Sequence, residues 1–197
     1  MQKTSFDIPF KKFNDWFEKA QANTNIVEPT AMCLSTVNEN NAPSSRMVLL
    51  KKFDEKGFCF FTNLTSRKGK EISQNKSSAI CFYWGFLGLQ IRIEGELENV
   101  SAKEADDYFI TRRRESQIGA WASKQSCEMA EWSEFEDRIK KITQDFEGQE
   151  IPRPPFWSGF RLVPNRIEFW EEGDFRIHRR EIYEKFSDGW NVKKLYP

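Results

Sequence analysis

Histidine is almost absent from this sequence: His178 is the only one among 197 residues. Cysteines are also few, and Cys33, Cys59, Cys81 and Cys127 form no Cys-x-x-Cys pair. Zinc-type sites draw on several such ligands at close spacing, so we expect no metal. The first three cysteines lie in apolar, strand-like runs, where a thiol behaves as a small core residue.

Apolar runs long enough to cross a membrane are missing as well, and the opening residues contain no hydrophobic segment of a secretory signal. Lys plus Arg total 30, as do Asp plus Glu, so the formal net charge is zero. Nucleic acids and anionic membranes select an excess of positive charge, so we expect neither as a partner. Because no glycine-rich dinucleotide fingerprint or Walker sequence is present, a dinucleotide or ATP is a poor candidate. A reduced, cytoplasmic protein is the default expectation.

Strand-like runs separated by short polar turns dominate residues 28–100. Their spacing predicts a meander of five antiparallel strands, which suggests a small barrel or a strongly curled sheet. The expected strands are "TAMCLSTV", "SRMVLLKKF", "FCFFTN", "SSAICFYWGF" and "LQIRIEGELENV". The chain returns to strands after residue 151, with a hairpin expected to turn at "EEGD".

Helical periodicity marks the remaining segments. Phe10, Phe13 and Phe17 recur at helical spacing near the start, and "SRKGKEISQN" predicts a short helix. Residues 101–123 predict one longer helix that begins with a capping box at Ser101 and Glu104. Residues 128–146 predict an amphipathic helix, and we interpret its apolar stripe as core or subunit contact: Trp132, Phe135, Ile139, Ile142 and Phe146.

We therefore expect a single, mainly β domain of the α+β class over residues 1–197. Its parts are an N-terminal helical segment (1–27), barrel strands (28–100), helices (101–150) and C-terminal strands (151–197). No internal repeat or long linker divides the chain.

Cations gather in four short segments, and the first two lie in the expected meander. In "RMVLLK", strand alternation places Arg46 and Lys51 on opposite faces. In "TNLTSRKGKEI", Thr65 or Ser66 is a natural N-cap, and the first helical turn then carries "RKGK". The helix dipole disfavours cations there, so a phosphate bound at the helix start would explain them; a solvated helix start is the alternative.

The third segment is "YFITRRRESQ", where Tyr108, Arg112 and Ser116 share one face if the helix continues through them. A phenol, a guanidinium and a hydroxyl together suit a second phosphate, although a polar surface face would look the same. The fourth is "FRIHRREIYEKF", which as a strand aligns Arg176, His178 and Arg180 on one face. That face offers donors without acceptors, which indicates an anionic neighbour; a solvated edge strand is the alternative.

Two phosphate-suited clusters and many aromatic side chains describe a site for two anionic, planar small molecules. Gln90 is a polar residue in an apolar strand, either satisfied inside a barrel or directed at a ligand's polar edge. "SKQS", residues 123–126, adds uncharged donors in an expected loop.

These segments resemble the pyridoxamine 5'-phosphate oxidase family in order and spacing. The motifs that carry the resemblance are "EPTAMCLSTV", "RMVLLK", "FFTNLTSRKGKEI", "RRRESQIGAWASKQS", "PPFWSGFRLVPNRIEFW", "RIHRR" and the closing Trp-x4-Leu-x-Pro. The resemblance covers nearly the whole chain from about residue 28 onward. It implies an FMN-binding split β-barrel of antiparallel strands with flanking helices, working as a homodimer with FMN at the subunit interface.

The resemblance also implies an activity and a set of site residues. The activity is oxidation of pyridoxamine 5'-phosphate and pyridoxine 5'-phosphate to pyridoxal 5'-phosphate, with O2 as electron acceptor and H2O2 as product. The implied FMN contacts are Arg46, Met47, Val48, Leu49, Leu50, Lys51, Phe61, Thr62, Ser66, Arg67, Lys68, Gln90, Gln125, Ser126, Trp170 and Arg180. The implied substrate contacts are Lys51, Tyr108, Arg112, Ser116, Arg176 and His178, of which Arg176 and His178 are the catalytic candidates. Position 61 is often tyrosine in the family, and here it is Phe.

Two other functions fit the same residues. A non-catalytic carrier of FMN or pyridoxal phosphate needs the anion sites but no arrangement for hydride transfer. A flavin reductase of the same fold would act on a different substrate. The presence of both the Tyr108, Arg112, Ser116 cluster and the Arg176, His178 pair favours the oxidase.

Overall fold

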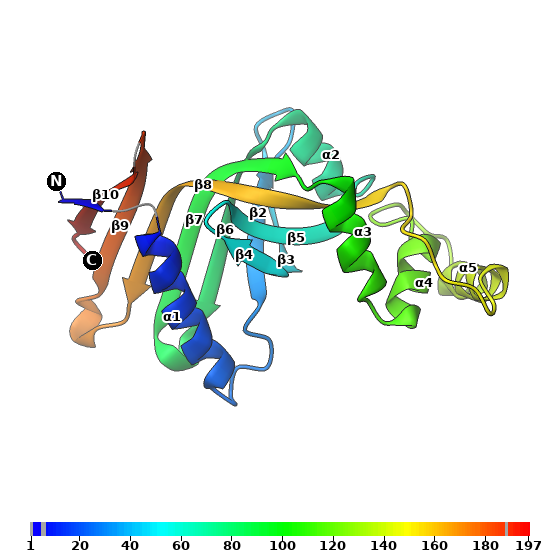
Figure 1. Cartoon of the computed structure of the whole chain (residues 1–197), viewed down its shortest axis with the longest axis horizontal. Helices are drawn as coiled ribbons and strands as arrows, with labels where there is room; N and C mark the ends of the chain where they lie inside the picture. The colour runs from blue at the N-terminus through cyan, green and yellow to red at the C-terminus, as the bar shows by residue number, and fades with distance from the viewer. Residues whose placement is uncertain (1, 5–6, 188) are drawn as a thin grey trace.

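The computed structural model describes residues 2–4, 7–187 and 189–197, and their strands join one antiparallel sheet (Figure 1). Its order is β1-β10-β9-β8-β7-β6-β2-β3, with β5 pairing both β8 and β4. The strands are β1 (Gln2–Thr4), β2 (Ala31–Val37), β3 (Pro43–Leu49), β4 (Lys52–Asp54), β5 (Gly57–Asn63), β6 (Ser77–Trp84), β7 (Leu89–Asn99), β8 (Trp157–Glu171), β9 (Arg179–Phe186) and β10 (Gly189–Leu195). The α+β, split-barrel class expected from the sequence is confirmed. The division into one domain stays a prediction.

The sheet curls about β8, its longest strand. The first half of β8 pairs with β5, the second half pairs with β9, and β7 runs alongside both halves. The register between β7 and β8 shifts after Glu94, where Asn165 is the extra residue of a bulge. At Gly95 a Cβ atom would lie 2.1 Å from the Val163 carbonyl oxygen, so the close approach at the bulge requires glycine.

The core lies between the inner face of this sheet and helix α1 (Ile8–Ala22). Phe13 of α1 is fully buried, with its ring centroid 4.8 Å from those of Phe53 and Phe58 and 5.2 Å from that of Phe82. The expected N-terminal helix is thus confirmed, and the structure shows that it belongs to the core. Figure 1 shows α1 lying across β7 and β8.

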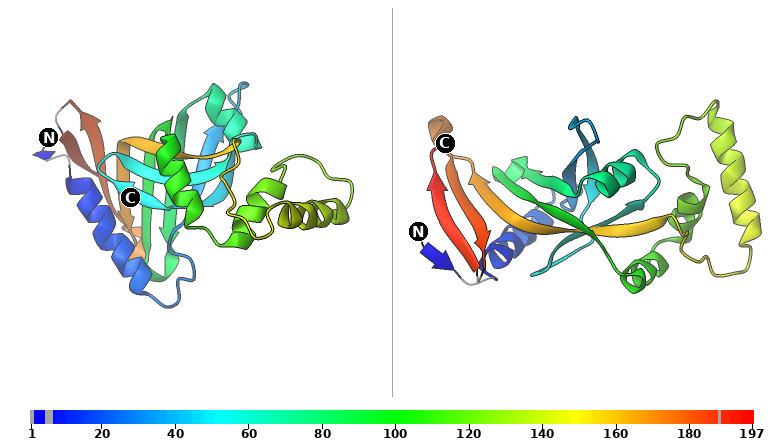
Figure 2. Two further views of the ribbon diagram at one scale, coloured as in Figure 1. Left: turned by 45° about the vertical axis from the view of Figure 1, so that its right-hand side comes forward. Right: turned by 90° about the horizontal axis from the view of Figure 1, so that it is seen from above.

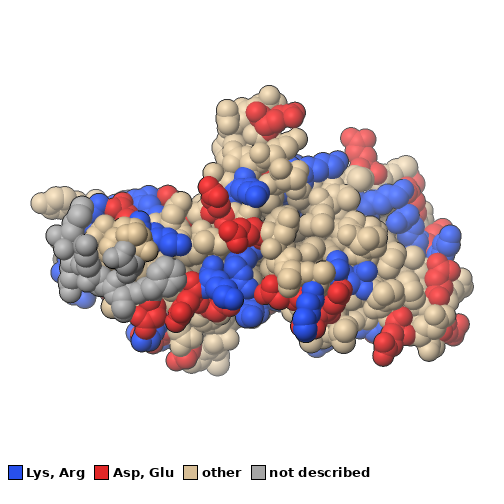
Figure 3. Space-filling model, turned by 45° about the horizontal axis from the view of Figure 1, so that its top comes forward, with Lys and Arg blue, Asp and Glu red and all other residues tan. Residues whose placement is uncertain are grey.

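Three further helices lie at the opposite end of the molecule from β9 and β10 (Figures 1 and 2). They are α3 (Ala102–Ile110), α4 (Arg114–Ala122) and α5 (Trp132–Asp145), while α2 (Arg67–Gln74) lies over the meander. The capping box of Ser101 and Glu104 is present at the start of α3. On the face in Figure 3, acidic and basic side chains are interspersed, in keeping with a net charge of zero.

Three sequence predictions were wrong at the level of local structure. The helix expected over residues 101–123 breaks at 111–113, and the strand expected over residues 45–53 breaks at 50–51. The strand expected to begin at residue 175 begins at Arg179. Ahead of it, a 3-10 turn, η2 (Asp174–Arg176), gives Phe175 and Arg176 positive φ angles of 54° and 66°. Arg176, His178 and Arg180 therefore do not share one strand face.

We predict that Phe13→Ala lowers the free energy of unfolding by about 3–5 kcal/mol, because the cavity it leaves lies among packed aromatic rings. Urea denaturation measures the change. Val27→Ala is the control, since Val27 is 96% exposed and its loss should change the free energy by less than about 0.5 kcal/mol. Equal effects of the two substitutions would contradict the assignment of α1 to the core.

Candidate active site

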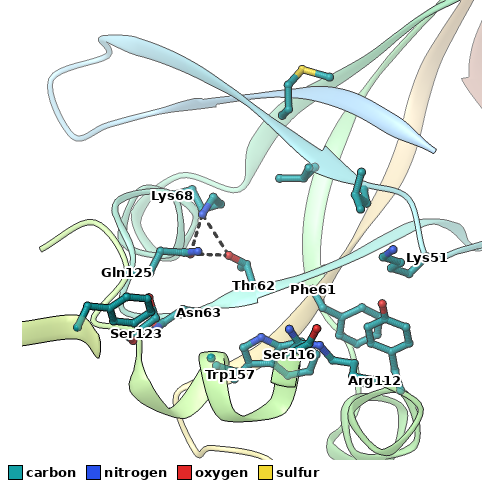
Figure 4. A pocket seen from close by; sticks show the side chains of 17 residues that line it. Lys51, Phe61, Thr62, Asn63, Lys68, Arg112, Ser116, Ser123, Gln125 and Trp157 are labelled. Atoms are coloured by element: carbon teal, nitrogen blue, oxygen red, sulfur yellow. Dashed lines mark hydrogen bonds between the residues drawn. The ribbon is translucent and has the colours of Figure 1, made fainter. Parts of the chain in front are cut away.

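A cavity of about 530 Å³ lies where β3 and β5 meet α2, α3 and α4 (Figure 4). Its volume is in the range of small-molecule sites, which is roughly 300–1,000 Å³. Most of its lining residues were expected from the sequence: Met47, Val48, Leu49, Lys51, Phe61, Thr62, Lys68, Tyr108, Arg112, Ser116 and Gln125. The others are Asn63, Gly119, Ala120, Ser123, Phe135 and Trp157.

One end of the cavity is built around Lys68, in the first turn of α2. Its Nζ donates to Gln125 Oε1 at 2.9 Å and to Thr62 Oγ1 at 3.2 Å (Figure 4). Burial lowers the pKa of Lys68, the nearby Arg46 lowers it further, and Glu71 opposes both. Ser66 is the N-cap, since its Oγ accepts from the Gly69 N–H at 3.3 Å. The N–H groups of residues 67 and 68 have no acceptor within the helix, so they are available as donors to an anion.

The other end of the cavity gathers Lys51, Tyr108, Arg112 and Ser116. Figure 4 shows Lys51, Arg112 and Ser116 on the side away from Lys68. The sequence predicts Tyr108, Arg112 and Ser116 on one helix face, which is wrong because the helix breaks at residues 111–113. Their side chains nevertheless line one cavity. The Arg112 NH1 atom is buried without a hydrogen-bond partner among the described residues, and burial lowers the pKa of this guanidinium. An unpaired buried donor of this kind suits an anion.

Stacked aromatic rings line the wall beside Arg112. The Phe61 ring stacks on Tyr108 with centroids 4.2 Å apart and on Trp157 with centroids 5.4 Å apart. The Arg112 guanidinium lies 4.8 Å from the Trp157 ring centroid, a cation–π contact that fixes its position. Because Phe61 takes part through its ring, the absence of a tyrosine hydroxyl leaves this stacking intact.

Beside the Lys68 end, a buried carboxylate organises two predicted arginines. Glu71 is 4% exposed, and its oxygens accept from Arg46 NH2 at 3.0 Å and Arg67 Nε at 2.9 Å. It also accepts from the hydroxyls of Thr36 and Ser44. Burial would raise the pKa of Glu71, but the hydrogen bonds from Thr36, Ser44 and Arg67 and the charge of Arg46 outweigh it and lower the pKa to about 2.

The remaining predicted residues lie outside this cavity. Arg46, Ser66 and Arg67 adjoin its Lys68 end, Leu50 is buried in the core, and Ser126 lies in the loop beside Gln125 with a φ of 70°. The second group lies on β7, β8, η2, β9 and the short link between η2 and β9: Gln90, Trp170, Arg176, His178 and Arg180.

This second group surrounds the connection between β8 and β9. The His178 ring lies 4.6 Å from the Trp170 ring, and its Nδ1 accepts from the Gly173 N–H at 3.3 Å. Nδ1 is therefore the unprotonated nitrogen, and Nε2 is left to contact a ligand. Gln90 pairs with Trp170 across the strands, on the face of β7 opposite the buried Leu89 and Ile91, so it does not point into the core.

Sequence reasoning missed several residues of this region, among them Trp157, Phe135 and Glu71. Trp157 lies in "PPFWSGF", a Pro-rich connection that also begins one of the motifs of the family resemblance, but no role follows for Trp157 from either. The sequence predicts Phe135 as a core or subunit contact, and the structure places it in the lining of the cavity. Glu71 carried a usable signal, because it follows Arg67 by four residues on a predicted helix, a spacing that favours an ion pair.

The fold and cavity define a class: a split-barrel protein with a cavity suited to anionic aromatic small molecules. The chain belongs to the pyridoxamine 5'-phosphate oxidase family. Residues 18–146 match the family model described as "Pyridoxamine 5'-phosphate oxidase", and residues 157–197 match that of the "Pyridoxine 5'-phosphate oxidase C-terminal dimerisation region".

Similar proteins cover almost the whole chain. A pyridoxine/pyridoxamine 5'-phosphate oxidase of Myxococcus xanthus is 48% identical over 96% of this chain and 91% of its own length, and one of Zymomonas mobilis is 46% identical over 96% and 98%. Among solved structures, PhzG of Burkholderia lata, in complex with tetrahydrophenazine-1-carboxylic acid, has a TM-score of 0.90 at 30% identity, covering 96% of this chain and 92% of its own. An FMN-binding protein of Nostoc punctiforme related to pyridoxamine 5'-phosphate oxidase has a TM-score of 0.76 at 19% identity over both full chains, which shows the fold. No helix in the described part of the chain has the length and apolar character needed to span a membrane.

The lowered pKa of Glu71 predicts an acid-labile contribution to stability. Its folded-state pKa of about 2 lies below the ordinary 4.5, so the stabilisation is present above about pH 5 and is lost as the pH falls towards 2. We expect Glu71→Gln to lower the free energy of unfolding at pH 7 by roughly 2–3 kcal/mol and to flatten its decline below pH 5. Urea denaturation over a pH series measures both slopes, and identical slopes for the two proteins would refute the assignment.

Proposed function

We propose that the protein is an FMN-dependent oxidase of pyridoxamine 5'-phosphate and pyridoxine 5'-phosphate that works as a homodimer. The amine, water and O2 give pyridoxal 5'-phosphate, ammonia and H2O2; the alcohol and O2 give pyridoxal 5'-phosphate and H2O2. Relatives that carry this activity in their names are 46–48% identical over 96% of the chain. The proposal includes a cytoplasmic location: the four cysteines are free thiols in the structure, as a reducing compartment requires.

The observation that carries the proposal is a single cavity with a cationic cluster at each end. The Lys68 end offers an ammonium, helix N–H groups and the amide of Gln125, which fit the phosphate and ribityl chain of FMN. The Arg112 end offers a second phosphate site with a buried donor that lacks a partner among the described residues. The proposal therefore places two phosphorylated aromatic molecules side by side in this cavity, which strand residues 47–49 also line.

Bound FMN supplies the hydride acceptor, which protein side chains lack. The role of the chain is then to bind and orient the substrate. Arg112 is held against the Trp157 ring. Together with Lys51 and the Ser116 hydroxyl, it would bind the substrate phosphate and set the distance of the reacting carbon from the cofactor. His178 would donate from Nε2 to an oxygen on the pyridine ring, since its Nδ1 is occupied by the Gly173 N–H. Arg176 would guide the reacting group.

A homodimer explains why the predicted site residues fall into two groups. Figure 1 places β9 and β10 at one end of the molecule and α4 and α5 at the other, so a single chain does not close one site from both groups. A second copy would bring its Gln90, Trp170 and Arg180 to the first copy's cavity. On the outer face of the sheet Met47 is 63% and Tyr83 is 66% exposed, and a second copy would cover them.

The first test is an aerobic assay of the FMN-loaded protein with pyridoxamine 5'-phosphate, measuring aldehyde and peroxide. We expect equal amounts of both products from the wild-type protein. We also expect Arg112→Gln to raise KM roughly 10–100-fold with FMN still bound, because a charged hydrogen bond to the substrate phosphate is lost.

The same assay separates the rival functions. Absence of product with FMN bound would identify a carrier, and bleaching of the flavin by a nicotinamide cofactor would identify a reductase. Faster turnover of a tetrahydrophenazine carboxylate, the kind of molecule bound in the PhzG structure, than of the pyridoxamine substrate would overturn the proposal.

Arg176→Ala should lower kcat by roughly 100-fold while the affinity for FMN stays unchanged, because a guanidinium that aligns the reacting group acts mainly in the transition state. Steady-state kinetics and flavin fluorescence measure the two quantities. Arg179→Ala is the matched control: its side chain is 84% exposed, and we expect wild-type turnover. Wild-type turnover of Arg176→Ala would remove Arg176 from the mechanism.

A further inference from the structure

Glu71 lies beneath the Lys68 end of the cavity and joins three elements. The carboxylate sits on α2, and its partners come from β2 (Thr36), β3 (Ser44 and Arg46) and α2 itself (Arg67). Thr36 is fully buried and Glu71 is 4% exposed, so neither side chain can contact a ligand directly. Any effect of this pair on binding must pass through the arginines.

The two arginines use their donors differently. NH1 of Arg46 donates to the Leu34 carbonyl oxygen and the Thr36 hydroxyl, and NH2 donates to Ser44 and Glu71. These four bonds leave only the Nε–H of Arg46 uncommitted. Arg67 is the opposite case, because it is held at Nε by Glu71 and its side chain is 65% exposed. Its NH1 and NH2 have no acceptor among the described residues, so their four donors face outward as a fork.

The charges of this cluster match a phosphate dianion. Arg46, Arg67 and Lys68 contribute three positive charges, and Glu71 removes one. A phosphate monoester carries about −1.5 to −2 at pH 7, so the assembled site approaches neutrality. On electrostatic grounds alone, loss of Glu71 would strengthen phosphate binding, because a third net positive charge attracts an anion more strongly. The effect on positioning is opposite: without Glu71 the Arg67 side chain is unanchored, and ordering it when the anion binds lowers the affinity.

We infer that Glu71 is a positioning residue for the phosphate of FMN: it anchors Arg67 at Nε so that the terminal nitrogens meet the phosphate, and it holds Arg46 beneath as a fixed charge. The inference rests on the proposed function, which makes this end of the cavity the FMN phosphate site. It makes Arg67 and Arg46 the two residues through which Glu71 acts on the phosphate.

The test compares FMN with riboflavin, which differs only in lacking the phosphate. Apoprotein of Glu71→Gln is titrated with each flavin while flavin fluorescence is followed. We expect the Kd for FMN to rise at least roughly tenfold and the Kd for riboflavin to stay within about twofold of wild type. Unchanged or tighter FMN binding would overturn the inference, and so would an equal loss of affinity for both flavins.

Two further variants control for folding and for charge. Thr36→Val keeps the shape and every charge but removes the hydroxyl between Arg46 and Glu71, so we expect a several-fold, FMN-specific loss of affinity. Glu104→Gln removes a carboxylate that pairs with Arg161 away from the cavity, and both flavins should bind as in wild type. Wild-type FMN affinity in Thr36→Val would contradict the network.

The outcome also separates this inference from the proposed function. A wild-type protein that binds no FMN would overturn both. FMN bound tightly by the wild type and equally tightly by Glu71→Gln would overturn the role of Glu71 alone. Oxidase activity of the FMN-loaded wild type tests the proposed function whatever the FMN affinity of Glu71→Gln.

Discussion

The bend in the sheet at β8 is the constraint on which the rest of the structure depends. A single strand, Trp157–Glu171, pairs with β5 along its first half and with β9 along its second. The bulge opposite Gly95 lets it change direction between the two. The first half carries Trp157 beside Phe61 at the cavity, and the second half carries Trp170 beside His178. One strand therefore fixes both groups of site residues, and it also holds them apart.

The same electrostatic arrangement recurs in both groups. Arg67 is anchored at Nε by the buried carboxylate of Glu71, and Arg180 donates from Nε at 2.8 Å to Glu168, which is 3% exposed. In each case the guanidinium donates to the carboxylate from Nε, so its two terminal nitrogens remain available to other partners. Burying an acid beneath an arginine fixes the direction of a long side chain without adding net charge. A chain with 30 cations and 30 acidic residues can thus build local anion sites while its total charge stays zero.

Periodicity and capping predicted much of this fold because those signals are local. The strands of the meander, the core helix with Phe13 and the capping box at Ser101 follow from side-chain alternation and from one turn of backbone donors. The helix break at residues 111–113 could not be predicted in this way. Arg114 donates to the carbonyl oxygens of Phe146 and Gln149, and the Gln117 amide donates to that of Phe109. The two Arg114 contacts reach chain 32 and 35 residues further on, and the Gln117 contact satisfies a carbonyl near the end of α3.

The sequence wrongly predicted a strand in the loop between β8 and β9 for a related reason. A Cβ atom at Gly173 would lie 2.1 Å from the Ile177 carbonyl oxygen, so the loop closes on itself there, and Phe175 and Arg176 take left-handed backbone angles. Such angles cost about 1–3 kcal/mol each and persist only where the surroundings enforce them. In one chain Phe175 is 94% and Ile177 is 68% exposed, so little packing supports the loop from within. Under the proposed dimer, the partner's cavity supplies that support. Cofactor binding and subunit association would then stabilise each other, because both use the same contacts.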